Sequence, residues 1–350
     1  MKVAIDVSPL KTGHRFRGIG AYTKHLVKAL QLIEVADFEA VLVEEGKIPR
    51  DCDLIHYPYF DLFFRTLPLV KKRKTVVTIH DTTPLVFPEH YPPGIKGKLK
   101  FGAQKLALRT VSGVITDSKN SKKDTTRYLD YPKEKIFVVY LAAADIFKPI
   151  TNHRSLVTVK QKYHLPNQFV LYVGDVNYNK NILGLVKACK SIKLPLVIVG
   201  KQAVQKKFDR KNIENQPLVQ LIKLYGKDKD VIRFGFVPDK DLVALYNLAT
   251  VYCQPSFYEG FGLPILEAMA CGTPVVTSKK ASLPEIAGKA AVFIDPYDIN
   301  DISNGIIVAI DDEDLREDLI ARGLKQAKKF SWEKVANETY KVYQEIIAKK

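Results

Sequence analysis

Residues 251–278, with the sequence VYCQPSFYEGFGLPILEAMACGTPVVTS, contain one complete strand–helix–strand unit. An apolar strand is predicted at 251–255 and a second at 274–278, and a helix is predicted between them at 262–271. Two consecutive strands joined by a crossover helix lie parallel, and both faces of a parallel sheet are covered by helices. This stretch therefore predicts an α/β fold built on a parallel sheet.

The same alternation of Val- and Ile-rich strands with helices extends over all 350 residues. Strands are predicted at 2–8, 39–44, 53–58, 74–80, 113–117, 135–141, 169–174, 195–200, 231–236, 251–255, 274–278 and 290–294. Helices are predicted at 18–33, 94–111, 118–129, 181–191, 201–211, 215–225, 239–248, 262–271, 299–310 and 312–329. The polar stretch 148–166 interrupts the pattern, which predicts two doubly wound, Rossmann-like domains at 1–155 and 156–330. Residues 331–350 are expected to form one more amphipathic helix, because Ser331 is a favourable N-cap.

The loop between Gln254 and Leu263 is the first candidate site, since ligands of open parallel sheets bind beyond the carboxyl ends of the strands. Its glycines let the backbone approach a ligand closely, and the helix that begins near Leu263 offers unpaired N–H groups to an anion. Glu259 precedes this helix, and Glu267 lies about one turn inside it. Two acids beside a phosphate-binding helix start are suited to bind hydroxyl groups. The alternative is a tight strand–helix turn with two solvated acids.

The run from Glu259 to Val276, EGFGLPILEAMACGTPVV, resembles a segment of the retaining, nucleotide-sugar-dependent glycosyltransferases of family 4 (group 1). The resemblance continues through residues 282–288, SLPEIAG, and the two-domain pattern covers essentially the whole chain. It implies the GT-B fold, in which two doubly wound Rossmann-like domains face a cleft, and it places the C-terminal helix back on the first domain. The first domain would be the acceptor side, and the second would hold the nucleotide sugar.

The resemblance also assigns roles to residues of this loop. The acid at Glu259 would bind hydroxyls of the donor sugar, and the acid at Glu267 would bind the ribose of the nucleotide. The backbone amides of Phe261, Gly262 and Leu263 would meet the sugar and the diphosphate. Two further substrate-binding positions are expected at Gly174 and Ser256.

A second candidate site follows the strand at 169–174, in the sequence YVGDVNYNKN at 172–181. Lys180 stands at a predicted helix start, where an ammonium group can neutralise a diphosphate. Read alone, it is an ordinary surface lysine. The resemblance favours the diphosphate contact, because the family carries a V-G-x-x-x-x-x-K element here. Many members have an arginine directly after the glycine, where this chain has Asp175, so Lys180 is expected to act without a second cation.

Two loops of the first domain complete the candidate site. Gly18 and Gly20 lie between the first strand and the first helix, where they could cradle a phosphate, although a plain helix-start turn is the alternative. Thr23 occupies the third glycine position of a dinucleotide fingerprint, which argues against an NAD site. His80, followed by Asp81, ends a strand and is more often a packed histidine. The resemblance implies that it reaches the donor sugar and the reacting centre.

No metal and no cofactor are predicted. Three D-x-D sequences occur, at 51–53, 228–230 and 239–241, but such pairs are short and common, and GT-B enzymes usually act without a metal. The four cysteines contain no CxxC pair, so a zinc or thioredoxin-like site is not expected. Residues 116–121, TDSKNS, resemble an S-x-x-S element that lines the acceptor path, and a helix N-cap is the alternative.

The charge is the unusual feature of the composition: 54 basic residues against 38 acidic ones give a formal net charge of +16. Part of it would serve the diphosphate, through Lys180 and Arg15 or Arg17. The rest lies mainly in lysine clusters at 71–74, 94–111 and 119–123. An anionic membrane surface is the favoured partner for these clusters, because no nucleic-acid-binding module is visible. No signal peptide or membrane-spanning segment is expected, which predicts a cytoplasmic protein peripheral to the inner face of the membrane.

Together these features predict a retaining, metal-independent hexosyltransferase in cell-surface polysaccharide or glycolipid synthesis. It would move a hexose from a nucleoside diphosphate sugar, GDP-mannose or a UDP-sugar with mannose slightly favoured, to a glycan or lipid-linked acceptor. Glu259, His80 and Lys180 are the expected catalytic residues. The alternatives are a catalytically silent basic protein that binds anionic membrane or nucleic acid, and a sugar-nucleotide epimerase of the same fold.

Overall fold

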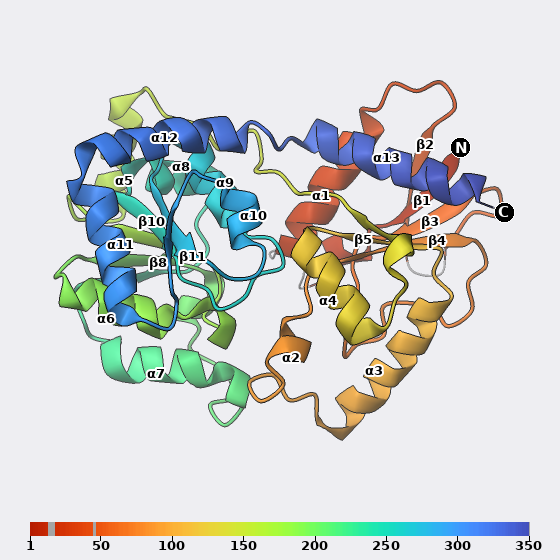
Figure 1. The fold of residues 1–350 in the computed structure, drawn as a ribbon, viewed down its shortest axis with the longest axis horizontal. Coiled ribbons are helices and arrows are strands. Elements are labelled where there is room, and N and C mark those ends of the chain that lie inside the picture. The colour runs from red at the N-terminus through yellow and green to blue at the C-terminus, as the bar shows by residue number, and fades with distance from the viewer. Residues whose placement is uncertain (13–17, 45–46, 350) are drawn as a thin grey trace. The chain divides into compact units, whose positions relative to one another are not determined.

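The computed structural model describes residues 1–12, 18–44 and 47–349 (Figure 1). The chain folds into two compact units, called unit 1 and unit 2 below. Unit 1 comprises Met1–Ala142 and Phe330–Lys350, and unit 2 comprises Ala143–Lys329. Each unit contains one six-stranded sheet in which every strand pair is parallel. Every predicted strand is present, and the predicted α/β class is confirmed.

Unit 1 is built on a sheet with the strand order β2-β1-β3-β4-β5-β6. Its strands are β1 (Lys2–Asp6), β2 (Glu39–Val43), β3 (Leu54–Tyr57), β4 (Lys74–Ile79), β5 (Gly113–Thr116) and β6 (Ile136–Val138). Its helices before the return of the chain are α1 (Gly18–Gln31), α2 (Thr83–Val86), α3 (Gly94–Arg109) and α4 (Lys119–Leu129), with 3-10 turns η1 (Ser8–Leu10) and η3 (Lys133–Lys135). Strands β3 and β5 are buried at every position, as expected for strands covered on both faces.

Unit 2 has the strand order β12-β11-β10-β7-β8-β9, so the direction of winding reverses between β7 and β10. Its strands are β7 (Val170–Val173), β8 (Leu196–Val199), β9 (Val231–Phe234), β10 (Val251–Gln254), β11 (Val275–Ser278) and β12 (Val292–Ile294). Its helices are α5 (His153–Lys162), α6 (Ile182–Ser191), α7 (Gln216–Tyr225), α8 (Asp239–Leu248), α9 (Leu263–Ala270), α10 (Leu283–Ala287), α11 (Ile299–Asp311) and α12 (Glu313–Ala327), with 3-10 turns η4 (Tyr178–Lys180), η5 (Lys201–Val204) and η6 (Ile213–Asn215).

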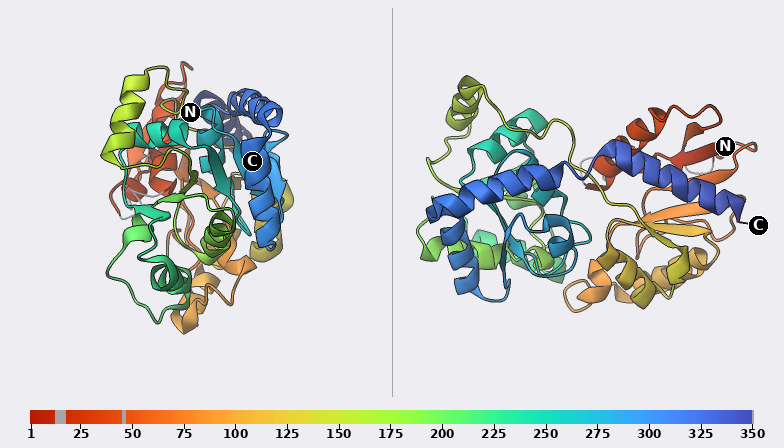
Figure 2. Two further views of the ribbon diagram at one scale, coloured as in Figure 1. Left: turned by 90° about the vertical axis from the view of Figure 1, so that its left-hand side faces the viewer. Right: turned by 45° about the horizontal axis from the view of Figure 1, so that its top comes forward.

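The last helix, α13 (Trp332–Ala348), packs on unit 1, as predicted for the C-terminal helix. It lies beside α1 in the views of Figures 1 and 2. The Ser331 side chain caps it by accepting a hydrogen bond from Lys334 N at 3.1 Å. The Trp332 ring stacks on His25 with centroids 5.0 Å apart, and the Tyr343 hydroxyl lies 2.7 Å from His56 Nδ1 in the core.

Two details of the organisation differ from the prediction. The expected boundary at 155–156 falls inside α5, a helix capped by Asn152 that belongs to unit 2, which begins at Ala143. The helix predicted at 201–211 is wrong: only η5 forms there. The reason is local, because the Asp209 and Asn212 side chains accept hydrogen bonds from the backbone two residues ahead, an arrangement that competes with a helix. The sequence prediction also missed α2, α5 and α10.

No helix among the described residues is long and apolar enough to cross a lipid bilayer.

Candidate functional site

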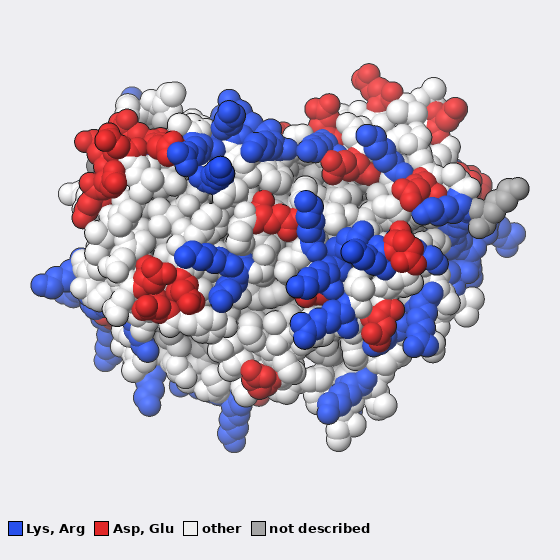
Figure 3. All heavy atoms as spheres, viewed as in Figure 1, with Lys and Arg blue, Asp and Glu red and all other residues white. Residues whose placement is uncertain are grey.

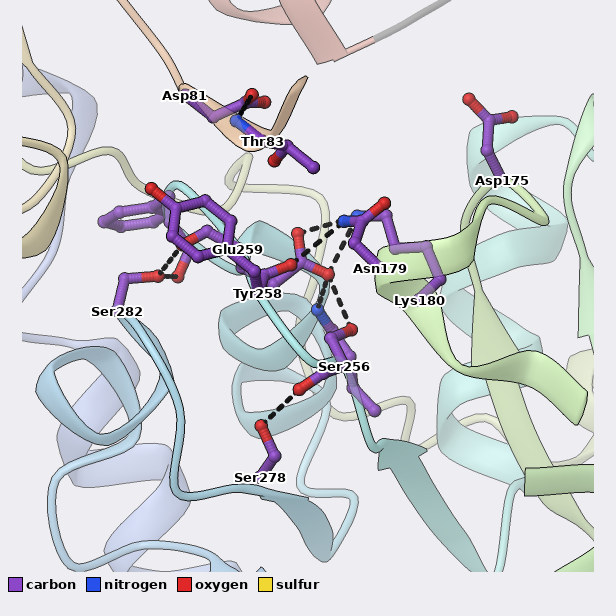
Figure 4. Close-up of polar contacts among 12 residues, drawn as sticks. Asp81, Thr83, Asp175, Asn179, Lys180, Ser256, Tyr258, Glu259, Ser278 and Ser282 are labelled. Atoms are coloured by element: carbon purple, nitrogen blue, oxygen red, sulfur yellow. Dashed lines mark hydrogen bonds and ion pairs between the residues drawn. The ribbon is translucent and has the colours of Figure 1, made fainter. Parts of the chain in front are cut away.

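The two motifs of unit 2 meet where the winding of its sheet reverses. Strands β7 and β10 are neighbours and pair in parallel, so the loops that leave their carboxyl ends emerge side by side. In doubly wound sheets this reversal point is the usual ligand position. The loop after β7 carries Lys180, and the loop after β10 carries Glu259 (Figure 4).

The centre of the site is an ion pair between these two residues. The Lys180 ammonium lies 2.8 Å from Glu259 Oε1 and 2.7 Å from Oε2, so it contacts both carboxylate oxygens. Glu259 is 7% exposed, and Lys180 keeps 23% of its side chain accessible. A carboxylate this buried is retained only with good partners, because burying a charge is costly. The buried ion pair therefore excludes, for Glu259, the alternative of a turn with two solvated acids.

Two neutral side chains donate hydrogen bonds to the same carboxylate. Ser256 Oγ donates to Glu259 Oε1 at 2.7 Å, and Gln254 Nε2 donates to it at 2.9 Å. Gln254 is oriented in turn by the Tyr252 hydroxyl, which donates to its side-chain oxygen at 2.8 Å. All three donors come from β10 or the residues directly after it. They fix the orientation of the carboxylate while leaving Lys180 at its outer side.

Asn179 connects the loop after β7 to the loop after β10 through two hydrogen bonds. Its side chain donates to the Tyr258 carbonyl at 2.9 Å, and its own carbonyl accepts from Phe257 N at 2.7 Å. Asn181 adopts a left-handed conformation, with φ 53°, and turns the chain from η4 into α6. Asparagine tolerates this conformation better than most residues. Asn179 is not among the predicted site residues, although it directly precedes Lys180 in the sequence.

The start of α9 is shaped by Gly262. This residue has φ +104°, and a Cβ atom added here would lie 2.7 Å from Leu283 Cδ2. Ser282 Oγ lies 2.9 Å from the Glu259 carbonyl and 2.8 Å from the Phe261 carbonyl, so it ties the loop to the segment before α10. Phe261 is buried, and Leu263 opens the helix. The absence of a side chain at Gly262 thus leaves room for Leu283 of α10.

Replacing Gly262 with alanine is expected to destabilise unit 2 by about 1–3 kcal/mol, because the new methyl group meets Leu283 and the backbone conformation becomes strained. Thermal denaturation of the variant would measure the loss. Alanine at Gly102, where an added Cβ meets nothing within 4 Å, is the control. Equal melting temperatures for the two variants would contradict the packing described here.

Glu267 lies in α9 and has its own partner. Its Oε2 accepts a hydrogen bond from the Tyr246 hydroxyl of α8 at 2.8 Å. Burial raises the pKa of Glu267 to about 7, against the opposing effect of this hydrogen bond. Near neutral pH such a carboxyl group can accept a hydrogen bond or donate one, and both suit a partner rich in hydroxyl groups. Tyr246 was not anticipated, because it comes from a different helix.

Gly174 and Asp175 lie at the beginning of the Lys180 loop. Gly174 has φ +152°, and a Cβ atom there would lie 2.6 Å from the Tyr172 hydroxyl. That hydroxyl donates to the Asp175 carbonyl at 2.9 Å, which fixes the turn. Figure 4 shows the Asp175 carboxylate pointing away from the Lys180–Glu259 pair. The acid at the position where the resemblance leads us to expect an arginine is therefore turned away from the ion pair.

The candidate residues of unit 1 gather at the carboxyl edge of its own sheet. His80 follows β4 and Asp117 follows β5, and these strands are paired neighbours. His80 Nδ1 lies 2.7 Å from Asp117 Oδ2, and His80 Nε2 lies 3.1 Å from the Pro58 carbonyl. Asp117 is 2% exposed and was not selected from the sequence.

The glycine loop of unit 1 is described only in part. Gly18 and Gly20 form the first turn of α1, with Gly18 exposed and Gly20 buried. Arg15 and Arg17, expected near the diphosphate, lie outside the described residues. For the segment 116–121, Ser118 is the N-cap of α4, and its side chain accepts from Ser121 N at 3.0 Å.

The D-x-D sequences have structural partners in the part of the chain that the structure describes. Lys2 pairs with Asp51, Lys190 pairs with Asp228 and Asp230, and Lys162 pairs with Asp241. Among the described residues, no three His, Cys, Asp or Glu side chains come together as metal ligands would.

Comparison with known proteins identifies the family. Residues 158–326 match the family model described as Glycosyl transferases group 1, and residues 28–142 match the model described as Glycosyltransferase Family 4. The chain is 36% identical over 279 residues to O-antigen chain mannosyltransferase B of Escherichia coli, an alignment that covers 77% of this chain and 70% of that protein. Serotype-specific mannosyltransferase WbdA of Escherichia coli is 32% identical over 267 residues, which cover 75% of this chain and 32% of that protein.

A solved structure agrees with the fold. Anabaena HepE in complex with UDP and glucose superposes with a TM-score of 0.73 at 18% identity, covering 99% of this chain and 100% of that one. The relatives above are transferases, so neither a silent binding protein nor an epimerase is favoured. The chain therefore belongs to the group 1 glycosyltransferases of glycosyltransferase family 4, an enzyme family with the GT-B fold.

Proposed function

We propose that this glycosyltransferase moves mannose from GDP-mannose to a hydroxyl group of a growing glycan or lipid-linked glycan, with retention of the anomeric configuration and without a metal ion. The observation that carries the proposal is the Glu259 carboxylate, held by Lys180, Ser256 and Gln254 at the reversal point of the unit 2 sheet. The two relatives named as mannosyltransferases support the choice of sugar. The UDP and glucose bound to HepE support a nucleoside diphosphate sugar as the donor.

In this proposal the bound donor separates Lys180 from Glu259 and gives each of them a new partner. The diphosphate takes the Lys180 ammonium, and hydroxyl groups of the sugar donate to the Glu259 oxygens that the ammonium leaves. Each buried charge thereby keeps a partner, which offsets the cost of breaking the pair. Glu267 would accept from the ribose hydroxyls. The amides at the start of α9 would face the diphosphate, as helix N-termini do for anions.

The proposed transfer step is consistent with these contacts. The bond between the sugar C1 and the phosphate oxygen breaks, and its electron pair leaves with GDP. The acceptor oxygen bonds to C1 on the same face, and its proton passes to the departing phosphate oxygen. Lys180 stabilises the negative charge that grows on the diphosphate, an effect larger in the transition state than in the bound donor.

A donor panel tests the proposal. Purified protein is incubated with GDP-mannose, UDP-glucose or UDP-N-acetylglucosamine and a mannose-terminated oligosaccharide, and the product is followed by mass spectrometry. We expect a mass increase of one hexose with GDP-mannose, and an α-linkage in the NMR spectrum of the product. Transfer from a UDP-sugar with none from GDP-mannose would refute the proposed donor, and a β-linked product would refute retention.

We also propose that unit 1 docks on an anionic membrane through α3. Ile95, Leu99 and Leu106 lie on one stripe of this helix and are 82%, 72% and 56% exposed. Lys96, Lys98 and Lys100 flank the stripe, and all three are exposed. Apolar side chains beside lysines on one helix match the chemistry of an anionic lipid surface. Phe64 extends the same surface. It is 64% exposed, and Lys100 Nζ lies 4.7 Å from the centroid of its ring.

Vesicle binding measures this docking. Wild-type protein is expected to cosediment with vesicles containing phosphatidylglycerol and to stay in solution with pure phosphatidylcholine. The double variant Ile95→Ser, Leu99→Ser should bind about tenfold less, because two apolar side chains no longer enter the interface. Leu224→Ser, on the exposed side of α7, is the control. Equal binding of the double variant and the control would rule out α3 as the docking surface.

A further inference from the structure

His80 stands between two hydrogen-bond acceptors. Its Nδ1 lies 2.7 Å from Asp117 Oδ2 and its Nε2 lies 3.1 Å from the carbonyl of Pro58. A carbonyl oxygen can only accept, so Nε2 carries a proton. An ionised carboxylate also only accepts, which requires a proton on Nδ1 as well. A protonated Asp117 could instead donate to a neutral ring, and burial does raise the pKa of Asp117. The distances therefore fit an imidazolium beside a carboxylate or a neutral ring beside a carboxylic acid, and the charges around His80 favour the first.

The carboxylate depends on this histidine. Asp117 is 2% exposed, and its second oxygen, Oδ1, is buried with no hydrogen-bond partner among the described residues. A buried carboxylate with half of its acceptors unused is costly, and an apolar pair would stabilise the fold better. Such a group is typical of a functional site, where charge is kept at the expense of stability.

The surroundings of His80 are consistent with a positive charge. Asp81, the next residue on the chain, adds a second carboxylate near the ring. The aromatic ring of Tyr22 in α1 packs edge-on against the His80 ring, with the two centroids 4.6 Å apart and the planes at 80°. The Tyr22 hydroxyl forms a hydrogen bond with Thr78 Oγ1 at 3.0 Å. Burial and the nearby charge of His80 lower the pKa of His56 in β3 to about 3, so His56 stays neutral. Burial alone would lower the pKa of His80, but Asp117 and the Pro58 carbonyl outweigh it and raise this pKa.

We propose that Asp117 is a positioning residue that holds His80 as an imidazolium, with its Nε2–H fixed on the Pro58 carbonyl, so that His80 serves the transferase as a fixed cation and not as a proton acceptor. Both ring nitrogens are occupied by the protein, which leaves no lone pair to accept a proton from the acceptor hydroxyl. A cation held in place needs no reorganisation when negative charge develops during the transfer. The catalytic part of this inference rests on the proposed function, whereas the charge state of His80 does not.

Nitrogen-15 NMR of the histidine rings tests the charge state directly in the wild-type protein. The chain has seven histidines, and His80→Gln identifies the signal of His80 by its disappearance. We expect both His80 ring nitrogens to show the protonated chemical shift at pH 7. A His80 signal with one protonated and one unprotonated nitrogen at pH 7 would overturn the proposal, whatever the enzyme's activity.

A pH profile of transfer tests the role of Asp117. In Asp117→Asn the imidazolium loses its counter-charge, so His80 should become neutral at neutral pH. We expect kcat at pH 7.5 to fall about tenfold to a hundredfold with little change in KM for the donor. The activity should recover as the pH is lowered, with the alkaline limb displaced by about one pH unit or more. Asp130→Asn, an exposed carboxylate in unit 1 paired with Lys105, is the matched control.

The outcomes separate the two proposals. If wild-type protein transfers no sugar but shows a protonated His80, the proposed function fails and the charge state stands. If wild-type protein is active and Asp117→Asn keeps its profile, the positioning role is wrong. A uniform loss of activity at every pH, without recovery in acid, would also reject it, because that result indicates structural damage.

Discussion

Replacing Glu259 with glutamine is expected to lower kcat/KM for transfer about a hundredfold to a thousandfold. The amide has nearly the size of the carboxylate but not its charge, and its N–H groups would face the Lys180 ammonium, which now contacts both oxygens at 2.7–2.8 Å. The donor would lose the acceptor that orients its sugar hydroxyls. Steady-state kinetics with the donor identified in the panel would measure the effect.

The control for this experiment is Glu313→Gln. Glu313 is an exposed carboxylate at the start of α12 in the same unit, paired with Arg316 at 3.2 Å, and its loss should leave the kinetics unchanged. A melting temperature of Glu259→Gln close to that of the wild type excludes unfolding as the cause. If Glu259→Gln showed the kinetics of the wild type, the Glu259 carboxylate would have no role in substrate binding or transfer.

Replacing Lys180 with methionine is expected to reduce kcat about a hundredfold to a thousandfold, because one of the groups that stabilises the leaving diphosphate is lost. Methionine keeps most of the apolar stem and removes the ammonium. The affinity for GDP should fall as well, since the charge contacts the diphosphate in the bound donor. Single-turnover kinetics and titration with GDP measure the two effects separately.

Lys190→Met is the matched control, because Lys190 lies at the other end of α6 and pairs with Asp228 and Asp230 on the surface. Its removal should change kcat by less than twofold. If Lys180→Met behaves like Lys190→Met, then the ion pair with Glu259 is only structural and the leaving group must be stabilised elsewhere.

Much of this site could be predicted from the sequence because its chemistry lies in continuous segments. The strand–glycine–helix pattern around Gly262 and the lysine at a helix start are local features, and the structure places Lys180 and Glu259 in contact. The contacts that orient Lys180 and Glu259 include residues that are far apart in the sequence. Asn179 bonds to Tyr258 only because β7 and β10 are neighbours in the sheet, and that order is set by packing of the whole unit.

The same reason explains why the sequence did not predict Asp117 as the partner of His80 in unit 1. His80 and Asp117 are 37 positions apart, and their contact depends on the pairing of β4 with β5. The sequence showed both residues at strand ends but contained no signal that joined them. The helix wrongly predicted at 201–211 failed for a different reason: the apolar pattern of that segment is weak, and its Asp and Asn side chains stabilise turns instead.

The central claim is that Glu259 recognises the sugar of the donor while Lys180 recognises its diphosphate. Calorimetric titration of GDP-mannose and of GDP into wild-type protein and Glu259→Gln tests it most directly. We predict that the wild type binds GDP-mannose more tightly than GDP, and that Glu259→Gln loses this preference while its affinity for GDP is unchanged or higher, because the released Lys180 ammonium is free to meet the phosphates. An undiminished preference for GDP-mannose in Glu259→Gln would contradict the assignment of Glu259 to the sugar.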